Sequence, residues 1–182
     1  MPLEEKPATT EVASNPFTGA EISNILRDTG WLAGELSPEH LAWCEHAAAI
    51  LGTQVADKAE LTNLLRLVFH YDAREILNYV ENHAVLARFG ARDVLRELAL
   101  LLLEPGPLTS ERFKEIITAL KEKLDIRGRE LFHPIRLALA GRAGEGELDR
   151  VILLLDEAAA LPFTTRVKSA RERILEFCAS LD

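Results

Sequence analysis

The sequence predicts an all-α fold of about eight or nine helices, and three observations support this prediction. Apolar residues recur at the 3.6-residue spacing of amphipathic helices through most of the chain. Capping patterns, in which Ser, Thr or Asp precedes Glu by three residues or Ser precedes Pro, stand before several of these stretches. No stretch alternates apolar and polar residues for long enough to indicate a strand.

The first expected helices begin at capping residues and end at or beside glycines. Residues 1–16 are rich in Pro, Thr, Ser and Glu and lack apolar periodicity, so we expect a mobile tail there. Thr18 begins a short helix that ends at Gly30. Ser37, which precedes a proline, begins a longer helix that runs through Leu51.

Two more helical segments follow before residue 90, and both begin with a capping box. Asp57 stands three residues before a glutamate, and its helix places apolar residues on one side. Asp72 repeats the pattern and begins a second segment, which ends near Gly90. Near Asn82 the apolar pattern of this segment is interrupted, so we expect an irregularity there.

The next helix, from Ala91 to Leu103, ends in an almost uninterrupted apolar run. Such a composition predicts the most enclosed helix of the fold. The sequence Glu-Pro-Gly-Pro at residues 104–107 must interrupt the helical pattern. We therefore expect two helical subdomains, one over residues 17–107 and one over residues 108–182.

A proline lies inside an apolar helical pattern in the C-terminal half. Thr109 or Ser110 first caps a helix that runs through Leu124, and the pattern that follows contains Pro134 and reaches Gly141. Proline lacks an N–H group and fixes its φ angle, and glycine commonly terminates a helix. We therefore expect two short helical pieces that meet at a fixed bend near Pro134, with Gly141 as the stop.

Length and charge limit the classes of partner. A chain of 182 residues with a net charge of −8 is one domain or two small ones. Residues 1–110 contain 8 Lys and Arg against 16 Asp and Glu, whereas residues 111–182 contain 13 of each. The first part is therefore a poor surface for a polyanion. Only local stretches, Arg112 to Arg142 or Arg166 to Arg173, are basic enough to bind one.

No pattern of catalytic chemistry is present, so we predict no catalytic residue and no cofactor. The sequence contains neither Gly-x-Ser-x-Gly, nor a phosphate-binding loop, nor Gly-x-Gly-x-x-Gly. Its five histidines and two cysteines are scattered, which argues against a metal site. No apolar stretch approaches the roughly 18 residues of a membrane span, and the N-terminus lacks the pattern of a signal peptide. We therefore expect a cytoplasmic location and no membrane partner.

Residues 124–155 contain two glycine-arginine pairs, one on each side of the helical segment that includes the proline. An arginine and several small residues follow the proline within this segment. The residues concerned are Gly128, Arg129, Leu131, Pro134, Arg136, Ala138, Leu139, Gly141, Arg142 and Leu148. Their order and spacing resemble the C-terminal, anticodon-binding region of bacterial glutamyl-tRNA synthetases, which are class I enzymes, and a weaker similarity covers residues 37–181. The catalytic motifs of that class, His-x-Gly-His and Lys-Ser-Lys-Ser, do not occur in the sequence. The resemblance therefore implies an anticodon-binding region that stands alone, without the catalytic domain.

The expected RNA-binding residues are Lys121, Arg129, Arg136 and Arg142. Guanidinium groups near the proline bend can contact phosphates or unstacked anticodon bases. The alternative is a structural role, in which these arginines pair with acidic side chains or bond the carbonyls at helix ends. We weigh the two roles equally for Arg129 and Arg142. For Arg136 we prefer the structural role, because Ile135 and the other neighbours of this arginine are apolar.

Two functions of different classes follow. The resemblance implies a tRNA-binding module without aminoacylation activity, whose partner is a glutamate or glutamine tRNA or a catalytic synthetase subunit. The alternative is a protein-interaction domain that kept the fold and lost RNA binding. The acidic composition favours this alternative, as do two departures from the family pattern, Ala140 in place of threonine and Glu145-Gly146 in place of glycine-proline. The retained Arg129, Arg136 and Arg142 favour the first function.

Overall fold

The computed structural model describes residues 15–182, and within them all regular structure is helical. The elements are α1 (Gly19–Asp28), α2 (Pro38–Leu51), a short 3-10 helix (Gly52–Gln54), α3 (Lys58–Phe69), α4 (Ala73–Asn78), α5 (Val80–Leu86), α6 (Ala91–Leu102), α7 (Ser110–Leu124), α8 (Arg129–Ala140), α9 (Glu147–Ala159) and α10 (Ala170–Leu181). The all-α prediction is confirmed, with ten α-helices in the described residues in place of eight or nine. The predicted tail lies outside the described residues except for Asn15 and Pro16.

The predicted helix starts are confirmed, because each capping residue accepts a hydrogen bond from the first turn of its helix. These residues satisfy N–H groups that have no partner within the helix. They are Thr18, Ser37, Asp57, Asp72 and Thr109.

The irregularity expected near Asn82 lies at Tyr79, which separates α4 from α5. Tyr79 has an extended backbone, with φ −76° and ψ 121°. The Asn82 side-chain amide donates to the Ile76 carbonyl at 2.7 Å, and an imidazole nitrogen of His83 lies 2.6 Å from the Leu77 carbonyl oxygen. The side chains of α5 therefore satisfy the last carbonyls of α4, which explains why two helices form where one interrupted pattern was visible.

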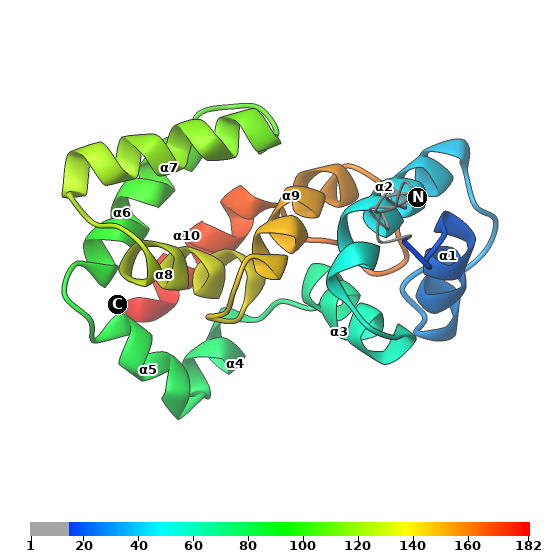
Figure 1. Cartoon of the computed structure of the whole chain (residues 1–182), viewed down its shortest axis with the longest axis horizontal. Coiled ribbons are helices and arrows are strands. Elements are labelled where there is room, and N and C mark those ends of the chain that lie inside the picture. The colour runs from blue at the N-terminus through cyan, green and yellow to red at the C-terminus, as the bar shows by residue number, and fades with distance from the viewer. Residues whose placement is uncertain (1–14) are drawn as a thin grey trace, which may run out of the picture.

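Helices α1 to α3 lie at one end of the elongated molecule, α4 to α8 and α10 lie at the other, and α9 runs between them (Figure 1). Helix α9 packs against α2 and α3 on one side and against α8 on the other. Helix α6 packs against both α8 and α10, so contacts cross the predicted boundary at residues 107–108. The division into two subdomains stays a prediction. No helix in the described part of the chain is long and apolar enough to cross a membrane.

The most enclosed helix of this end of the molecule is α8, and the prediction that the helix from Ala91 to Leu103 is the most enclosed one was wrong. Leu100 and Leu103 are 58% and 42% exposed. By contrast, eight of the twelve residues of α8 are buried. An apolar run without gaps places some of its residues on the outer face of a helix, so its composition overestimates its burial.

Helix α8 runs without interruption through Pro134, so the two helical pieces predicted on either side of this proline are one helix. Pro134 lies in the second turn, where its missing N–H group would have bonded the carbonyl of Glu130. Glu130 is exposed, and water can satisfy that carbonyl. Gly141 ends the helix as predicted, in the left-handed conformation with φ +85°.

The C-terminal ends of α3 and α8 are joined by the buried guanidinium of Arg173 in α10. Its Nη1 donates to the carbonyls of Leu67 at 2.8 Å and Leu139 at 3.0 Å, and its Nη2 donates to that of Val68 at 2.6 Å. Its Nε donates to the Lys168 carbonyl at 3.0 Å. Burial lowers the pKa of Arg173 to about 10, so the group stays charged at neutral pH.

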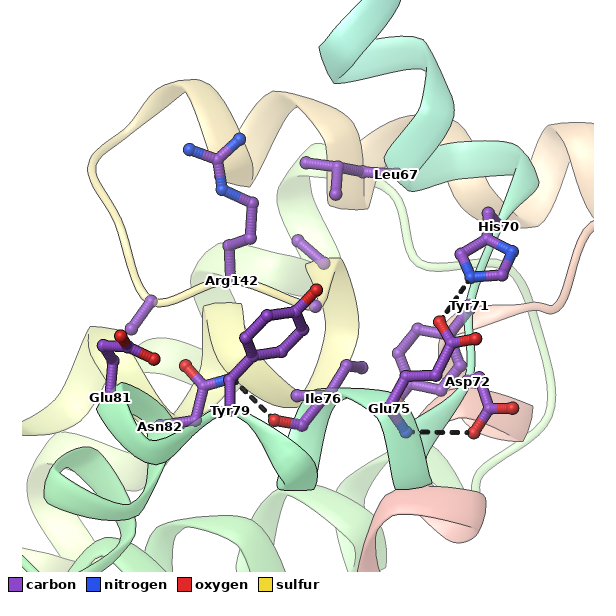
Figure 2. A pocket seen from close by; sticks show the side chains of 13 residues that line it. Leu67, His70, Tyr71, Asp72, Glu75, Ile76, Tyr79, Glu81, Asn82 and Arg142 are labelled. Carbon is purple, nitrogen blue, oxygen red and sulfur yellow. Dashed lines mark hydrogen bonds and ion pairs between the residues drawn. The ribbon is translucent and has the colours of Figure 1, made fainter.

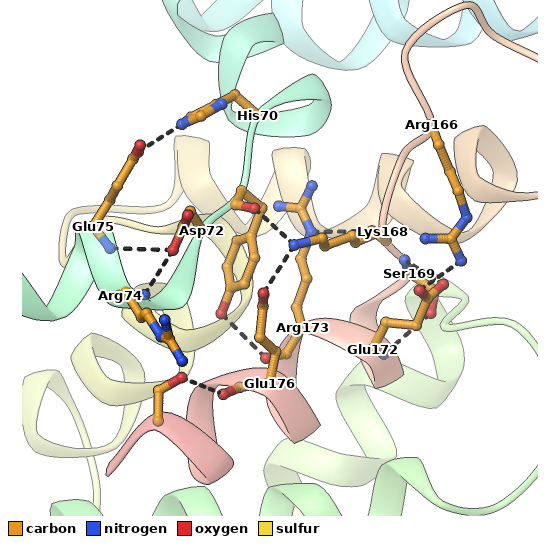
Figure 3. A network of polar contacts seen from close by, with 12 residues as sticks. His70, Asp72, Arg74, Glu75, Arg166, Lys168, Ser169, Glu172, Arg173 and Glu176 are labelled. Atoms are coloured by element: carbon orange, nitrogen blue, oxygen red, sulfur yellow. Dashed lines mark hydrogen bonds and ion pairs between the residues drawn. The ribbon is translucent and has the colours of Figure 1, made fainter.

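Tyr71 and Lys168 extend this network at the start of α4 and of α10. The Tyr71 hydroxyl donates to the carbonyls of Ala138 and Arg173, at 2.6 and 3.1 Å. Lys168 donates to the Tyr71 carbonyl at 3.0 Å and to Glu176 at 2.9 Å (Figure 3). The segment that connects the two ends of the molecule is thereby fixed to α8 and α10.

We predict that Arg173→Met destabilises the protein by about 3 to 5 kcal/mol, because it leaves several buried carbonyls without donors. Arg171→Met is the matched control, since Arg171 is exposed on the same helix and its replacement should change stability by about 0.5 kcal/mol or less. Urea denaturation measures both free energies of unfolding. Equal stabilities of the two variants would contradict the structural role of Arg173.

We predict that Gly141→Ala destabilises the protein by about 1 kcal/mol, because an alanine is strained at positive φ. Gly146 is the control, since its φ is −64° and a Cβ there meets no atom within 4 Å. Gly146→Ala should leave the thermal midpoint almost unchanged. If the two substitutions had the same effect on the thermal midpoint, the helix stop would not depend on the glycine.

Candidate nucleic-acid interface

A cavity of about 440 Å³ opens between the α4–α5 region and the C-terminal end of α8 (Figure 2). Buried side chains of Tyr71, Ile76 and Ala140 form part of its lining. Because Gly141 and the Arg173 network fix the backbone at this end of α8, the cavity stands on rigid elements.

The open side of the cavity carries aromatic and polar groups. Tyr79, whose side chain is 64% exposed, and Arg142 both border it (Figure 2). Glu81 and Asn82 lie at the beginning of α5 and also line it. An exposed aromatic ring and a guanidinium can stack on a planar base and donate hydrogen bonds to it or to a phosphate.

Arg142 is the predicted residue that reaches this cavity. It follows Gly141 directly, so the left-handed turn of the glycine directs the chain, and Arg142 is exposed. Its guanidinium forms neither a hydrogen bond nor an ion pair with another residue of the described chain. All of its donors are therefore available to a ligand.

Arg136 is used inside the protein, which agrees with the structural role preferred for it. Its guanidinium binds both carboxylate oxygens of Asp149, at 2.8 and 2.9 Å, and donates to the Gly144 carbonyl at 2.8 Å. It also lies 4.8 Å from the centre of the Phe132 ring. The residue is buried, so it holds the α8–α9 loop against α8 and offers little to RNA.

Arg129 and Lys121 have partial partners. The Arg129 guanidinium is exposed and lies 3.6 Å from the Glu145 carboxylate. The Lys121 amine lies 5.7 Å from the centre of the Phe132 ring, which it shares with Arg136. Lys121 and Arg136 therefore meet at the Phe132 ring. Arg129 and Arg136 both contact the α8–α9 loop. Arg142 lies apart from them, at the cavity.

Most cationic side chains of the second basic stretch, Arg166 to Arg173, form contacts within the protein. Arg166 pairs with Glu172 at 2.6 Å and Lys168 pairs with Glu176 at 2.9 Å (Figure 3). Arg173 is completely buried. Only the exposed Arg171 of this stretch has no such partner among the described residues, so the stretch is a poor second surface for a polyanion.

Tyr79, Asn82 and the His70–Glu75 pair were not predicted from the sequence as site residues. His70 Nε2 lies 2.7 Å from Glu75 Oε2 at the opposite edge of the cavity. The only trace of Tyr79 and Asn82 in the sequence was the interrupted apolar pattern of their segment. No group of three or more potential metal ligands occurs among the described residues.

The chain is similar in sequence to known proteins over most of its length. Residues 22–161 match the family model described as "Anticodon binding domain". The chain is 32% identical over 131 residues to the glutamate–tRNA ligase of Geobacillus thermodenitrificans, covering 71% of this chain and 26% of that protein. It is 30% identical over 136 residues to the glutamate–tRNA ligase of Bacillus subtilis, covering 75% of this chain and 28% of that protein.

The glutamate–tRNA ligase of Exiguobacterium sibiricum gives the same picture, with 30% identity over 137 residues and coverage of 75% and 28%. The chain thus spans little more than a quarter of the length of the curated relatives it matches. No solved structure matches it significantly. Since the family model covers most of the chain, the protein belongs to the anticodon binding domain family.

Proposed function

We propose that this protein binds a tRNA of the glutamate or glutamine type through its anticodon stem and loop. The observation that carries the proposal is that the exposed Tyr79 and Arg142 line one cavity at the end of α8, and that Arg142 forms no ion pair among the described residues. The chain is also a member of this family. The names of the relatives, glutamate–tRNA ligases, support the choice of tRNA.

The chemistry of the site suits an unpaired nucleotide better than a duplex. Bases in a loop expose their faces and their hydrogen-bonding edges, which an aromatic ring and a guanidinium can bind. The cavity of about 440 Å³ is large enough to take one base. With a net charge of −8 and few free cations, the protein can contact only a few phosphates. We therefore expect a dissociation constant in the micromolar range.

A protein-interaction domain is the second candidate, and the acidic charge favours it. The ion pairs of two predicted RNA-binding residues also support it, since Arg136 pairs with Asp149 and Arg129 lies near Glu145. The partner under this hypothesis is a protein, such as a catalytic synthetase subunit. Absence of binding to any tRNA at low salt, where electrostatic attraction is strongest, would leave this second function standing.

We predict that Arg142→Ala weakens the binding of a glutamate tRNA by about 1 to 3 kcal/mol if the guanidinium contacts a base edge. Binding should also weaken with salt, with a slope of about 0.7 to 0.9 per phosphate contact. Fluorescence titrations at two salt concentrations measure both effects. Arg27→Ala is the control, because Arg27 is an exposed arginine on α1 at the opposite end of the molecule (Figure 1). An equal loss with both variants would show a general charge effect and not a site.

We further predict that the chain alone does not activate glutamate, because it contains no pattern for ATP chemistry. Glutamate-dependent pyrophosphate exchange, measured with saturating tRNA, should equal the rate of a mock purification. A higher rate that co-purifies with the folded protein would contradict this part of the proposal.

A further inference from the structure

The loop between α5 and α6 exposes a phenylalanine almost completely. Phe89 is 92% exposed, the highest value among the large exposed apolar side chains of the described residues. The next residue, Gly90, has φ +80° and packs so closely on Ile126 that a Cβ would collide with it. The loop therefore packs closely on the Ile126 side chain of the α7–α8 turn, while the Phe89 ring lies in solvent.

Arginines flank Phe89 although this part of the chain is acidic overall. Residues 88–96 contain three arginines against one aspartate. Asp93 lies 4.0 Å from Arg96. Neither Arg88 nor Arg92 forms an ion pair within the described residues. A local excess of positive charge around an exposed aromatic ring is the composition of a surface that binds single-stranded nucleic acid.

Arg88 is positioned without being neutralised. Its Nη1 lies 3.1 Å from Nδ1 of His133 in α8. Burial and the nearby Arg88 charge hold the pKa of His133 below its ordinary value, so the imidazole is neutral at pH 7 and accepts the hydrogen bond. A carboxylate in this position would have cancelled the charge that a phosphate needs. The neutral imidazole orients the guanidinium and leaves its charge available.

The loop and the Arg142 cavity lie at the two ends of α5. Glu81 and Asn82 line the Arg142 cavity, whereas Arg88, Gly90 and Arg92 line a second cavity of about 610 Å³. The seven residues of α5 separate the two sites by about 10 Å, at 1.5 Å per residue. The two sites are therefore close to each other along the axis of α5.

We propose that Phe89 is a stacking platform for an unpaired base of the bound RNA, and that Arg88 and Arg92 contact the adjacent phosphates. The proposal rests on the proposed tRNA binding and adds a second contact site to it. A protein partner is disfavoured, because arginines flank Phe89 in the sequence and no other large exposed apolar residue of the described chain lies in this loop.

Three variants of one position test stacking against mere hydrophobicity. Phe89→Leu keeps an apolar side chain without an aromatic face, and we expect it to weaken binding of a glutamate tRNA transcript by about 5- to 150-fold, the range for loss of one stacked base. Phe89→Ala should do the same, whereas Phe89→Trp should stay within about twofold of wild type, because an aromatic face remains. Leu41→Ala is the control, since Leu41 is an exposed apolar residue of α2 at the other end of the molecule.

Salt dependence distinguishes the stacking residue from its neighbours. Phe89→Leu should leave the salt slope unchanged, because stacking releases no counterions, whereas Arg88→Ala should reduce the slope by about one phosphate contact. A fully paired RNA of the same length should bind wild type and Phe89→Leu equally.

The outcomes separate this inference from the proposed function. If Arg142→Ala weakens tRNA binding and Phe89→Leu does not, the stacking role is wrong and tRNA binding stands. If Phe89→Trp is as weak as Phe89→Leu, the ring does not stack and the inference is equally overturned. If wild type binds no tRNA at low salt, the proposed function fails first and the stacking site fails with it.

Discussion

The rest of this structure depends on the hydrogen bonds between the buried Arg173 guanidinium and backbone carbonyls at the ends of α3 and α8. The last carbonyls of α3 and α8 point toward each other, and the C-terminal ends of two helices carry partial negative charges that repel. One buried cation bonds three carbonyls at these helix ends and a fourth in the segment before α10. It receives no carboxylate within hydrogen-bonding distance in the described chain, so helix ends act as its counterion. The position of Gly141, and hence of Arg142, follows from this arrangement.

The arginines of this acidic chain divide according to their partners. Arg136 forms an ion pair with the Asp149 carboxylate, which holds the α8–α9 loop against α8. Arg173 meets backbone carbonyls in the interior. Arg88 donates a hydrogen bond to the neutral His133 imidazole. Arg142 forms no ion pair among the described residues. No acidic partner therefore offsets the positive charge of these two side chains. The net charge of the chain therefore says less about RNA binding than the identity of each arginine's partner does.

Much of the fold could be predicted, since helix starts and stops are local. Asp57 and Asp72 cap helices, and Gly141 stops one, through contacts within a few residues. The roles of Tyr79 and Arg173 could not be predicted, because their partners are set by packing between distant segments. The enclosure of α8 in place of α6 has the same origin. Arg136 is an example among the four predicted RNA-binding residues. The sequence motif identifies this arginine, but it does not identify Asp149 as the partner of its guanidinium.

The departures from the family pattern acquire a physical meaning in this structure. Ala140 lines the Arg142 cavity, so a methyl group stands where the pattern has a threonine hydroxyl that could donate to a ligand. Glu145 lies 3.6 Å from Arg129 and offsets part of its charge. Both changes weaken the polar surface around the end of α8. In the proposed tRNA complex, Arg88 and the exposed Phe89 ring at the other end of α5 add a contact that does not depend on the α8–α9 loop.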